Sequence, residues 1–74
     1  MAIHSVRILD RSGDTTLRYD PTDSAAVHDV EQRFRRLMDH NFVAFDTSTH
    51  PGRIIAAFDP NASEIIVAPR FAGG

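Results

Sequence analysis

The residues best suited to chemistry lie at the carboxyl end of the sequence, which reads APRFAGG over residues 68–74. Gly73 and Gly74 have no side chains, so only backbone and an α-carboxylate reach the end, and this segment can enter a narrow channel. Pro69 stiffens its start by fixing φ and removing a donor, and Arg70 adds a permanent charge with a planar set of donors. The pattern predicts an arm that carries a carboxylate into another protein's active site; an ordinary frayed end is the alternative.

The other polar side chains do not form a pattern that predicts catalysis. The histidines are scattered through the sequence, at His4, His28, His40 and His50, without the spacing of a metal site. Cysteine is absent, which excludes thiolate catalysis, disulfides and cysteine-ligated metals. Asp46, Ser48 and His50 share one loop, but three loop residues do not make an oriented triad with an oxyanion hole. We therefore expect no metal site and no enzyme active site in the chain itself.

Length and charge limit the class of protein. A chain of 74 residues forms one domain with a small core. The formal net charge of -2 argues against a nucleic-acid binder, because phosphate binding needs a basic excess on one face. No apolar run approaches membrane-spanning length, and the N-terminus lacks the features of a signal peptide. We expect a cytoplasmic protein that binds neither nucleic acid nor membrane.

A hairpin followed by a helix is predicted for the first half of the chain. Residues 3–9 and 15–19 alternate in polarity on either side of an Arg-Ser-Gly-Asp turn, which predicts two paired strands. Thr22, Asp23 or Ser24 can cap a helix, and Asn41 is suited to end it in the left-handed conformation. Apolar residues recur at helical spacing between them, at Ala26, Val27, Val30, Phe34, Leu37 and Met38.

Three further strands are predicted at residues 42–46, 53–58 and 64–68. The last contains four consecutive apolar residues, which favours a central strand covered on both faces. In so short a chain the helix must cross one face of a single mixed sheet, with the last strand beside the first. The expected fold class is α+β in the order β-β-α-β-β-β. A β-grasp satisfies this order most economically, and a split β-α-β arrangement is the alternative.

The predicted domain spans residues 1–68 and the predicted arm residues 69–74. A second surface for partners is expected on the strand that contains Ile54 and Ile55. One of these two side chains must face the helix, because successive residues of a strand point to opposite faces. The alternation by itself does not decide which one.

The segment FDPNASEIIVAPRFAGG, residues 58–74, resembles the carboxyl end of the ubiquitin-like β-grasp superfamily, including the thiamine and molybdopterin sulfur carriers. Pro69 is closer to the sulfur carriers, and Arg70 stands where ubiquitin also has an arginine. The resemblance implies that an ATP-dependent activating enzyme adenylates the Gly74 carboxylate, which is then passed on as a thioester or converted to a thiocarboxylate. It also implies that the chain binds no cofactor itself and that ATP is used by the partner. The residues that the partner would contact are Pro69, Arg70, Phe71, Ala72, Gly73 and Gly74, with Arg70 read by its charge and Phe71 by apolar contact.

The absence of lysine bears on the choice within this superfamily, since all eight basic residues are arginine. A GC-rich genome would produce this bias, and so would selection against an amine that attacks the activated Gly74 of another copy. The leading hypothesis is therefore a ubiquitin-like protein modifier, with a conjugating enzyme and a deconjugating protease as further partners. A sulfur carrier for cofactor biosynthesis and a β-grasp interaction module that is never activated are the alternatives.

Overall fold

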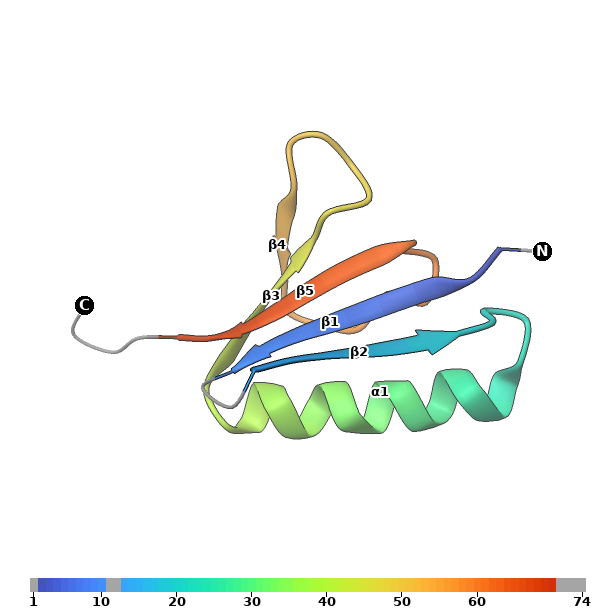
Figure 1. The fold of residues 1–74 in the computed structure, drawn as a ribbon, viewed down its shortest axis with the longest axis horizontal. Helices are drawn as coiled ribbons and strands as arrows, with labels where there is room; N and C mark the ends of the chain where they lie inside the picture. The colour runs from blue at the N-terminus through green and yellow to red at the C-terminus, as the bar shows by residue number, and fades with distance from the viewer. Residues whose placement is uncertain (1, 11–12, 71–74) are drawn as a thin grey trace.

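The computed structural model describes residues 2–10 and 13–70, which form one helix lying along one face of a five-stranded sheet (Figure 1). The elements in chain order are β1 (His4–Asp10), β2 (Gly13–Tyr19), α1 (Ser24–Asp39), β3 (Phe42–Asp46), β4 (Arg53–Ile55) and β5 (Glu64–Pro69). Their order across the sheet is β2-β1-β5-β3-β4, with β1 and β5 parallel and the other neighbours antiparallel. The predicted α+β class and element order are confirmed, and β5 lies centrally beside β1.

Helix α1 begins and ends at residues whose side chains or backbone suit those positions. The Asp23 carboxylate accepts hydrogen bonds from the backbone N–H groups of Ala25 and Ala26, at 3.1 and 3.2 Å. These bonds satisfy two donors that have no partner within the first helical turn. Asn41 follows the helix with a φ of 67°, the left-handed conformation predicted for it. The chain therefore reverses directly into β3.

The core lies between α1 and the sheet face that it covers. Phe34 of the helix is fully buried, and its ring centroid lies 5.7 Å from that of Phe58. Phe58 in turn lies 5.9 Å from Tyr19, so three aromatic rings join the helix, the edge strand β2 and the segment after β4. The buried apolar residues are Val6, Ile8, Tyr19, Val30, Phe34, Ala44, Ala62, Ile65 and Val67.

The predicted strand at residues 53–58 is wrong in its second half, because β4 ends at Ile55. Alternation from Ile55, which packs against the core, would have placed Phe58 on the opposite face had the strand continued. By leaving the sheet after Ile55 the chain turns Phe58 toward Phe34 and Tyr19 instead. The free energy gained by burying the Phe58 ring thus outweighs the free energy of pairing three more residues at the sheet edge.

The first hairpin is longer than its predicted strands. β1 reaches Asp10, and β2 already begins at Gly13, with Asp10 and Gly13 paired across the ladder. Gly13 has a φ of 127°, which a residue with a side chain rarely adopts. Residues 11 and 12 of the predicted turn lie outside the described residues. The two strands therefore pair in unbroken register over their full length.

Among the residues that the structure describes, Tyr19 has a buried side-chain polar atom that lacks a partner. Its side chain is 4% exposed, and its hydroxyl makes no hydrogen bond within the described residues. Burial, with a smaller contribution from the Asp59 carboxylate, raises the pKa of this phenol. The ring therefore stabilises the fold by packing. Its hydroxyl has lost its hydrogen bonds to water without gaining a partner among the described residues.

We expect Tyr19→Phe to raise the free energy of unfolding by about 1 kcal/mol, because it removes an unsatisfied buried hydroxyl and keeps the ring. Urea denaturation followed by circular dichroism measures this change. Tyr19→Ala is the control and should lower stability by about 3–5 kcal/mol through loss of the ring. A clear loss of stability in Tyr19→Phe would contradict the assignment, since it would mean that the hydroxyl is hydrogen-bonded.

Candidate functional site

The start of the predicted arm is part of the sheet. Pro69 is the last residue of β5 and pairs with Phe42 of β3. The backbone N–H of Arg70 then donates to the carbonyl of Asn41 at 3.0 Å, while the Arg70 side chain is exposed. Regular pairing thus extends through Pro69, one residue beyond the predicted domain boundary, and one further backbone hydrogen bond holds residue 70. The residue that ends the helix also holds the chain where the arm begins.

The remaining arm residues lie outside the described part of the chain. This applies to Phe71, Ala72, Gly73 and Gly74. The reactive carboxylate assigned to Gly74 and the apolar contact assigned to Phe71 stay predictions. The structure does show which surfaces surround the point from which these residues continue.

The face of the sheet opposite α1 carries a row of side chains in register across all five strands. Thr16, Arg7 and Ile66 are successive cross-strand neighbours, and Phe45 and Ile54 continue the row through β3 to β4. Such neighbours share a face of the sheet and contact one another. Val43 and Ala68 form a second pair beside this row.

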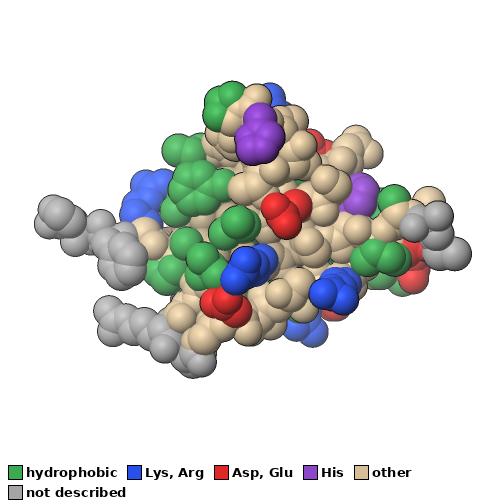
Figure 2. All heavy atoms as spheres, turned by 45° about the horizontal axis from the view of Figure 1, so that its top comes forward, with side chains coloured by type: hydrophobic (Ala, Val, Ile, Leu, Met, Phe, Trp, Pro, Cys, Tyr) green, Lys and Arg blue, Asp and Glu red, His purple; other side chains and the backbone are tan. Residues whose placement is uncertain are grey.

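These apolar residues form a patch on the face of the sheet that α1 does not cover. We call it the outer-face patch and define it as Val43, Phe45, Ile54, Ile66 and Ala68. Figure 2 turns this side toward the viewer and shows hydrophobic side chains gathered there, with basic side chains beside them. A contiguous apolar area of this kind is typical of a surface that binds another protein.

The outer-face patch corrects one expectation. Ile66 and Ala68 were expected to be covered because β5 is apolar at consecutive positions, yet both are only half-buried. One helix can cover one face, and within the described residues no helix or strand packs over the other. Neighbouring side chains in the sheet shield Ile66 partly, with Arg7 on one side and Phe45 on the other. The apolar alternation of Val43 and Phe45 was the signal in the sequence that this face is also apolar.

The structure decides between the two isoleucines of β4. Ile54 is 71% exposed and lies on the outer face opposite Phe45. Ile55 packs against the core beneath α1, so it is not part of an exposed binding surface. Of the two predicted contact residues only Ile54 is open to a partner.

The loop after β3 is organised by a buried carboxylate, not by a catalytic triad. Asp46 is 3% exposed and accepts hydrogen bonds from both the backbone N–H and the hydroxyl of Ser48, the former at 3.0 Å. Arg53 of β4 lies 3.8 Å away as an ion pair. His50 is exposed and makes no hydrogen bond to Asp46 or Ser48 within the described residues. The Ser48 hydroxyl therefore donates to the Asp46 carboxylate, and His50 is not placed to act as its general base.

These bonds set the protonation of Asp46. The hydroxyl and N–H of Ser48 stabilise the carboxylate and lower the pKa of Asp46, with a smaller contribution from Arg53. A carboxylate whose pKa is lower in the folded state than in the unfolded state stabilises the fold above its unfolded pKa. That contribution is lost as the pH falls through the folded value.

We expect Asp46→Asn to lower the urea midpoint at pH 7, where wild-type Asp46 is ionised and bonded. The difference between wild type and variant should shrink below about pH 4, where the unfolded-state carboxylate becomes protonated. Urea denaturation curves of both proteins at a series of pH values measure this difference in stability. Asp39→Asn removes the same charge from a carboxylate without a hydrogen bond or ion pair among the described residues, and should not reproduce this pH dependence. An Asp46→Asn deficit that is equal at pH 7 and pH 3 would contradict the ionised assignment.

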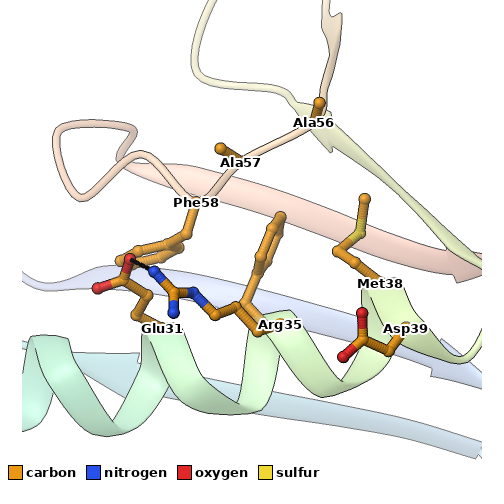
Figure 3. A pocket seen from close by; sticks show the side chains of 8 residues that line it. Glu31, Arg35, Met38, Asp39, Ala56, Ala57 and Phe58 are labelled. Atoms are coloured by element: carbon orange, nitrogen blue, oxygen red, sulfur yellow. Dashed lines mark hydrogen bonds and ion pairs between the residues drawn. The ribbon is translucent and has the colours of Figure 1, made fainter.

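A hollow of about 290 Å³ lies between α1 and the segment after β4 (Figure 3). Its apolar lining comes from Phe34, Met38 and Phe58, and the Glu31 carboxylate and Arg35 guanidinium form an ion pair 3.4 Å apart on its rim. Figure 3 shows this pair on the helix side of the opening. The lining includes no hydroxyl, amine or histidine, and the Glu31 carboxylate is paired with Arg35, so it does not suggest a reaction.

Three of the histidines have hydrogen-bond partners, two of which lie within the helix and one far along the chain. His4 Nδ1 is 3.0 Å from the Pro60 carbonyl, His28 Nε2 is 3.0 Å from Gln32, and His40 Nδ1 is 2.6 Å from the Arg36 carbonyl. Within residues 2–10 and 13–70, no three histidine or acidic side chains gather as a metal site would require. No helix in that part of the chain is long and apolar enough to cross a membrane.

Comparison of the chain with protein-family models, with curated proteins and with solved structures gave no match.

Proposed function

We propose that the chain is a ubiquitin-like protein modifier of the cytoplasm whose Gly74 carboxylate is activated by a partner enzyme and transferred to a target protein. The proposal rests on one observation above the others. The strand that leads to the Gly-Gly segment is the central strand of the sheet, parallel to β1 and joined to β3 through Pro69. An arm that continues from such a strand is anchored by the most buried part of the fold.

We infer further that the fold is a β-grasp. The order β2-β1-β5-β3-β4, the parallel pairing of the first and last strands and the single helix across one face all support this assignment. A split β-α-β arrangement fits less well, because β5 pairs with both β1 and β3. The fold alone does not imply the function, so the proposal depends on the residues around the arm.

The surface next to the arm suits recognition by a larger enzyme. Arg70 presents an exposed guanidinium directly after the last residue of β5, suited to a carboxylate on the partner. The outer-face patch lies on the same strand, through Ile66 and Ala68, and reaches Ile54 at the sheet edge. An apolar patch beside a fixed charge supports docking that is both stable and oriented.

The chemistry that we propose is supplied by the partner enzyme and by ATP. A Gly74 carboxylate oxygen attacks the α-phosphorus of ATP and releases pyrophosphate, giving an acyl-adenylate. A cysteine thiolate of the partner then attacks the carbonyl carbon and releases AMP, and an amine of the target displaces the thiolate to form an amide. The chain itself contributes the carboxylate and its presentation, so it is a substrate and not an enzyme.

The decisive experiment is incubation of the chain with ATP and the adenylating enzyme encoded nearest its gene, followed by intact mass measurement and by analysis of covalent adducts. We expect adducts to other proteins that require ATP and disappear when Gly74 is deleted. Deletion of Ala2 is the control, since it shortens the chain by one residue far from the arm.

Other outcomes of this experiment would overturn the proposal. The mass gain of one oxygen-to-sulfur exchange without protein adducts would identify a sulfur carrier. No change with ATP, and partner binding retained without Gly73 and Gly74, would identify an interaction module that is never activated.

We expect Arg70→Ala to slow adenylation by roughly tenfold, because an exposed arginine that pairs with a partner carboxylate is a frequent centre of binding energy. The rate of ATP–pyrophosphate exchange measures this step. The melting temperature should stay unchanged, because the hydrogen bond from residue 70 to Asn41 is made by the backbone. Arg36→Ala, on the exposed surface of α1, is the matched control and should exchange at the wild-type rate. An unchanged rate in Arg70→Ala would remove this residue from the recognition site.

A further inference from the structure

The two edges of the sheet differ in how they could bind another strand. β4 is three residues long, which leaves little edge for a partner. β2 is seven residues long, contains no proline and pairs with β1 in unbroken register, and within the described residues no strand pairs with its other side. A long regular edge with free peptide groups is the kind of strand that adds a partner strand.

The hairpin geometry shows which peptide groups of β2 point outward. Two residues separate Asp10 from Gly13, so this closing pair is the one that exchanges both hydrogen bonds. Hydrogen-bonded and non-hydrogen-bonded pairs then alternate along an antiparallel ladder. Asp14, Thr16 and Arg18 therefore direct their N–H and C=O groups away from β1.

The charges on this edge are arranged symmetrically about its midpoint. Thr16 is the central residue of β2, and Asp14 and Arg18 lie two positions before and after it. All three side chains are on the outer face, because they alternate with Leu17 and Tyr19, which pack on the core. Asp14 already contacts Arg7 at 2.8 Å, whereas Arg18 makes no ion pair with any residue that the structure describes.

We propose that β2 pairs antiparallel with β2 of a second copy of this chain, about a two-fold axis at Thr16. The two strands overlap over their full length only when the axis passes through Thr16. This register places each Asp14 opposite Arg18 of the other copy. Hydrogen bonds form at the outward peptide groups of Asp14, Thr16 and Arg18. Each Asp14 carboxylate then lies between Arg7 of its own chain and Arg18 of the other.

Other registers lack this complementarity. With the two-fold axis at Thr15, Thr16 would face Asp14 of the other copy and Arg18 would lie beyond the paired segment. With the axis at Leu17, Thr16 would face Arg18 and Asp14 would lie beyond the paired segment. A centre at Asp14 or Arg18 sets like charges opposite each other, which is unfavourable. The pattern therefore favours one closed dimer over open-ended pairing of edges.

The β2 edge has a hollow on its helix side. A hollow of about 250 Å³ lies between β2 and α1, with Leu17, Ala26 and Val30 in its lining. Asp29 and Arg33 line it on the helix side, and their side chains are 3.5 Å apart as an ion pair. Because Asp29 and Arg33 neutralise each other, the register depends on the charges of Asp14 and Arg18 on the strand. In the dimer Thr15 of the second copy lies opposite Leu17, which is half-buried in one copy.

This inference goes beyond the proposed function and does not depend on it. β2 and β4 are at opposite edges of the sheet, so the dimer leaves Ile54 and the rest of the outer-face patch on β3 and β5 free. Because the two copies are antiparallel, the two β5 strands end at opposite ends of the combined sheet. A dimer would therefore present two separate arms.

Sedimentation velocity over a concentration series tests the dimer with a pair of charge variants. We expect wild type to dimerise, and Arg18→Glu alone to weaken the dimer by roughly tenfold or more, because the introduced carboxylate faces Asp14 of the other copy. Asp14→Arg alone should do the same by setting two arginines opposite each other. An equimolar mixture of the two variants should restore a dimer, since every facing pair is then of opposite charge.

The backbone pairing has its own test. Thr16→Pro removes the outward N–H at the centre and keeps the bonds between β1 and β2, so it should abolish the dimer, whereas Thr16→Val should retain it. Circular dichroism verifies that each variant is folded. A wild type that stays monomeric at millimolar concentration overturns the proposal. So does a dimer that survives in folded Thr16→Pro, or a charge mixture no tighter than its separate components.

Discussion

The pairing of β5 with both β1 and β3 is the constraint on which the rest of the fold depends. It brings the last strand of the chain into the centre of the sheet, parallel to the first. Ile65 and Val67 become fully buried there and form the floor of the core against which α1 packs. A parallel pair cannot be joined by a tight turn, so the chain between β1 and β5 has to cross the sheet, and the helix covers one face as it does so.

The same strand connects stability with the candidate site. Alternation along β5 sends Ile65 and Val67 into the core and Ile66 and Ala68 to the outer face. Because the single helix covers only one of the two sheet faces, an apolar surface remains on the outer face, beside the residues that continue into the arm. Pro69 and Arg70 are still held by β3 and by Asn41, so the arm starts from a fixed position. Pre-organisation of this kind lowers the entropy cost of docking.

The edges of the sheet follow from the same arrangement. With β5 in the centre, the hairpin strand β2 and the short strand β4 are left at the two sides. β4 is limited because Phe58 leaves the sheet for the core, which shortens that edge. β2 keeps its full length, and Asp14 and Arg18 restrict which strand can pair with it. One edge is thus suited to a partner strand and the other is not.

Local features of the sequence determined much of this protein. A cap among Thr22, Asp23 and Ser24, the left-handed stop at Asn41 and the apolar spacing between them predicted the helix, because these are interactions within one or two turns of chain. The structure selects Asp23 as the cap. The alternation of the strands predicted the element order, and the Gly-Gly segment suggested the function. Only the tertiary structure decided that Ile54 and not Ile55 is exposed, and that β5 pairs with β3 through Pro69. These outcomes depend on register between strands far apart in the chain, and register is set by which side chains fill the core together, which no single segment specifies.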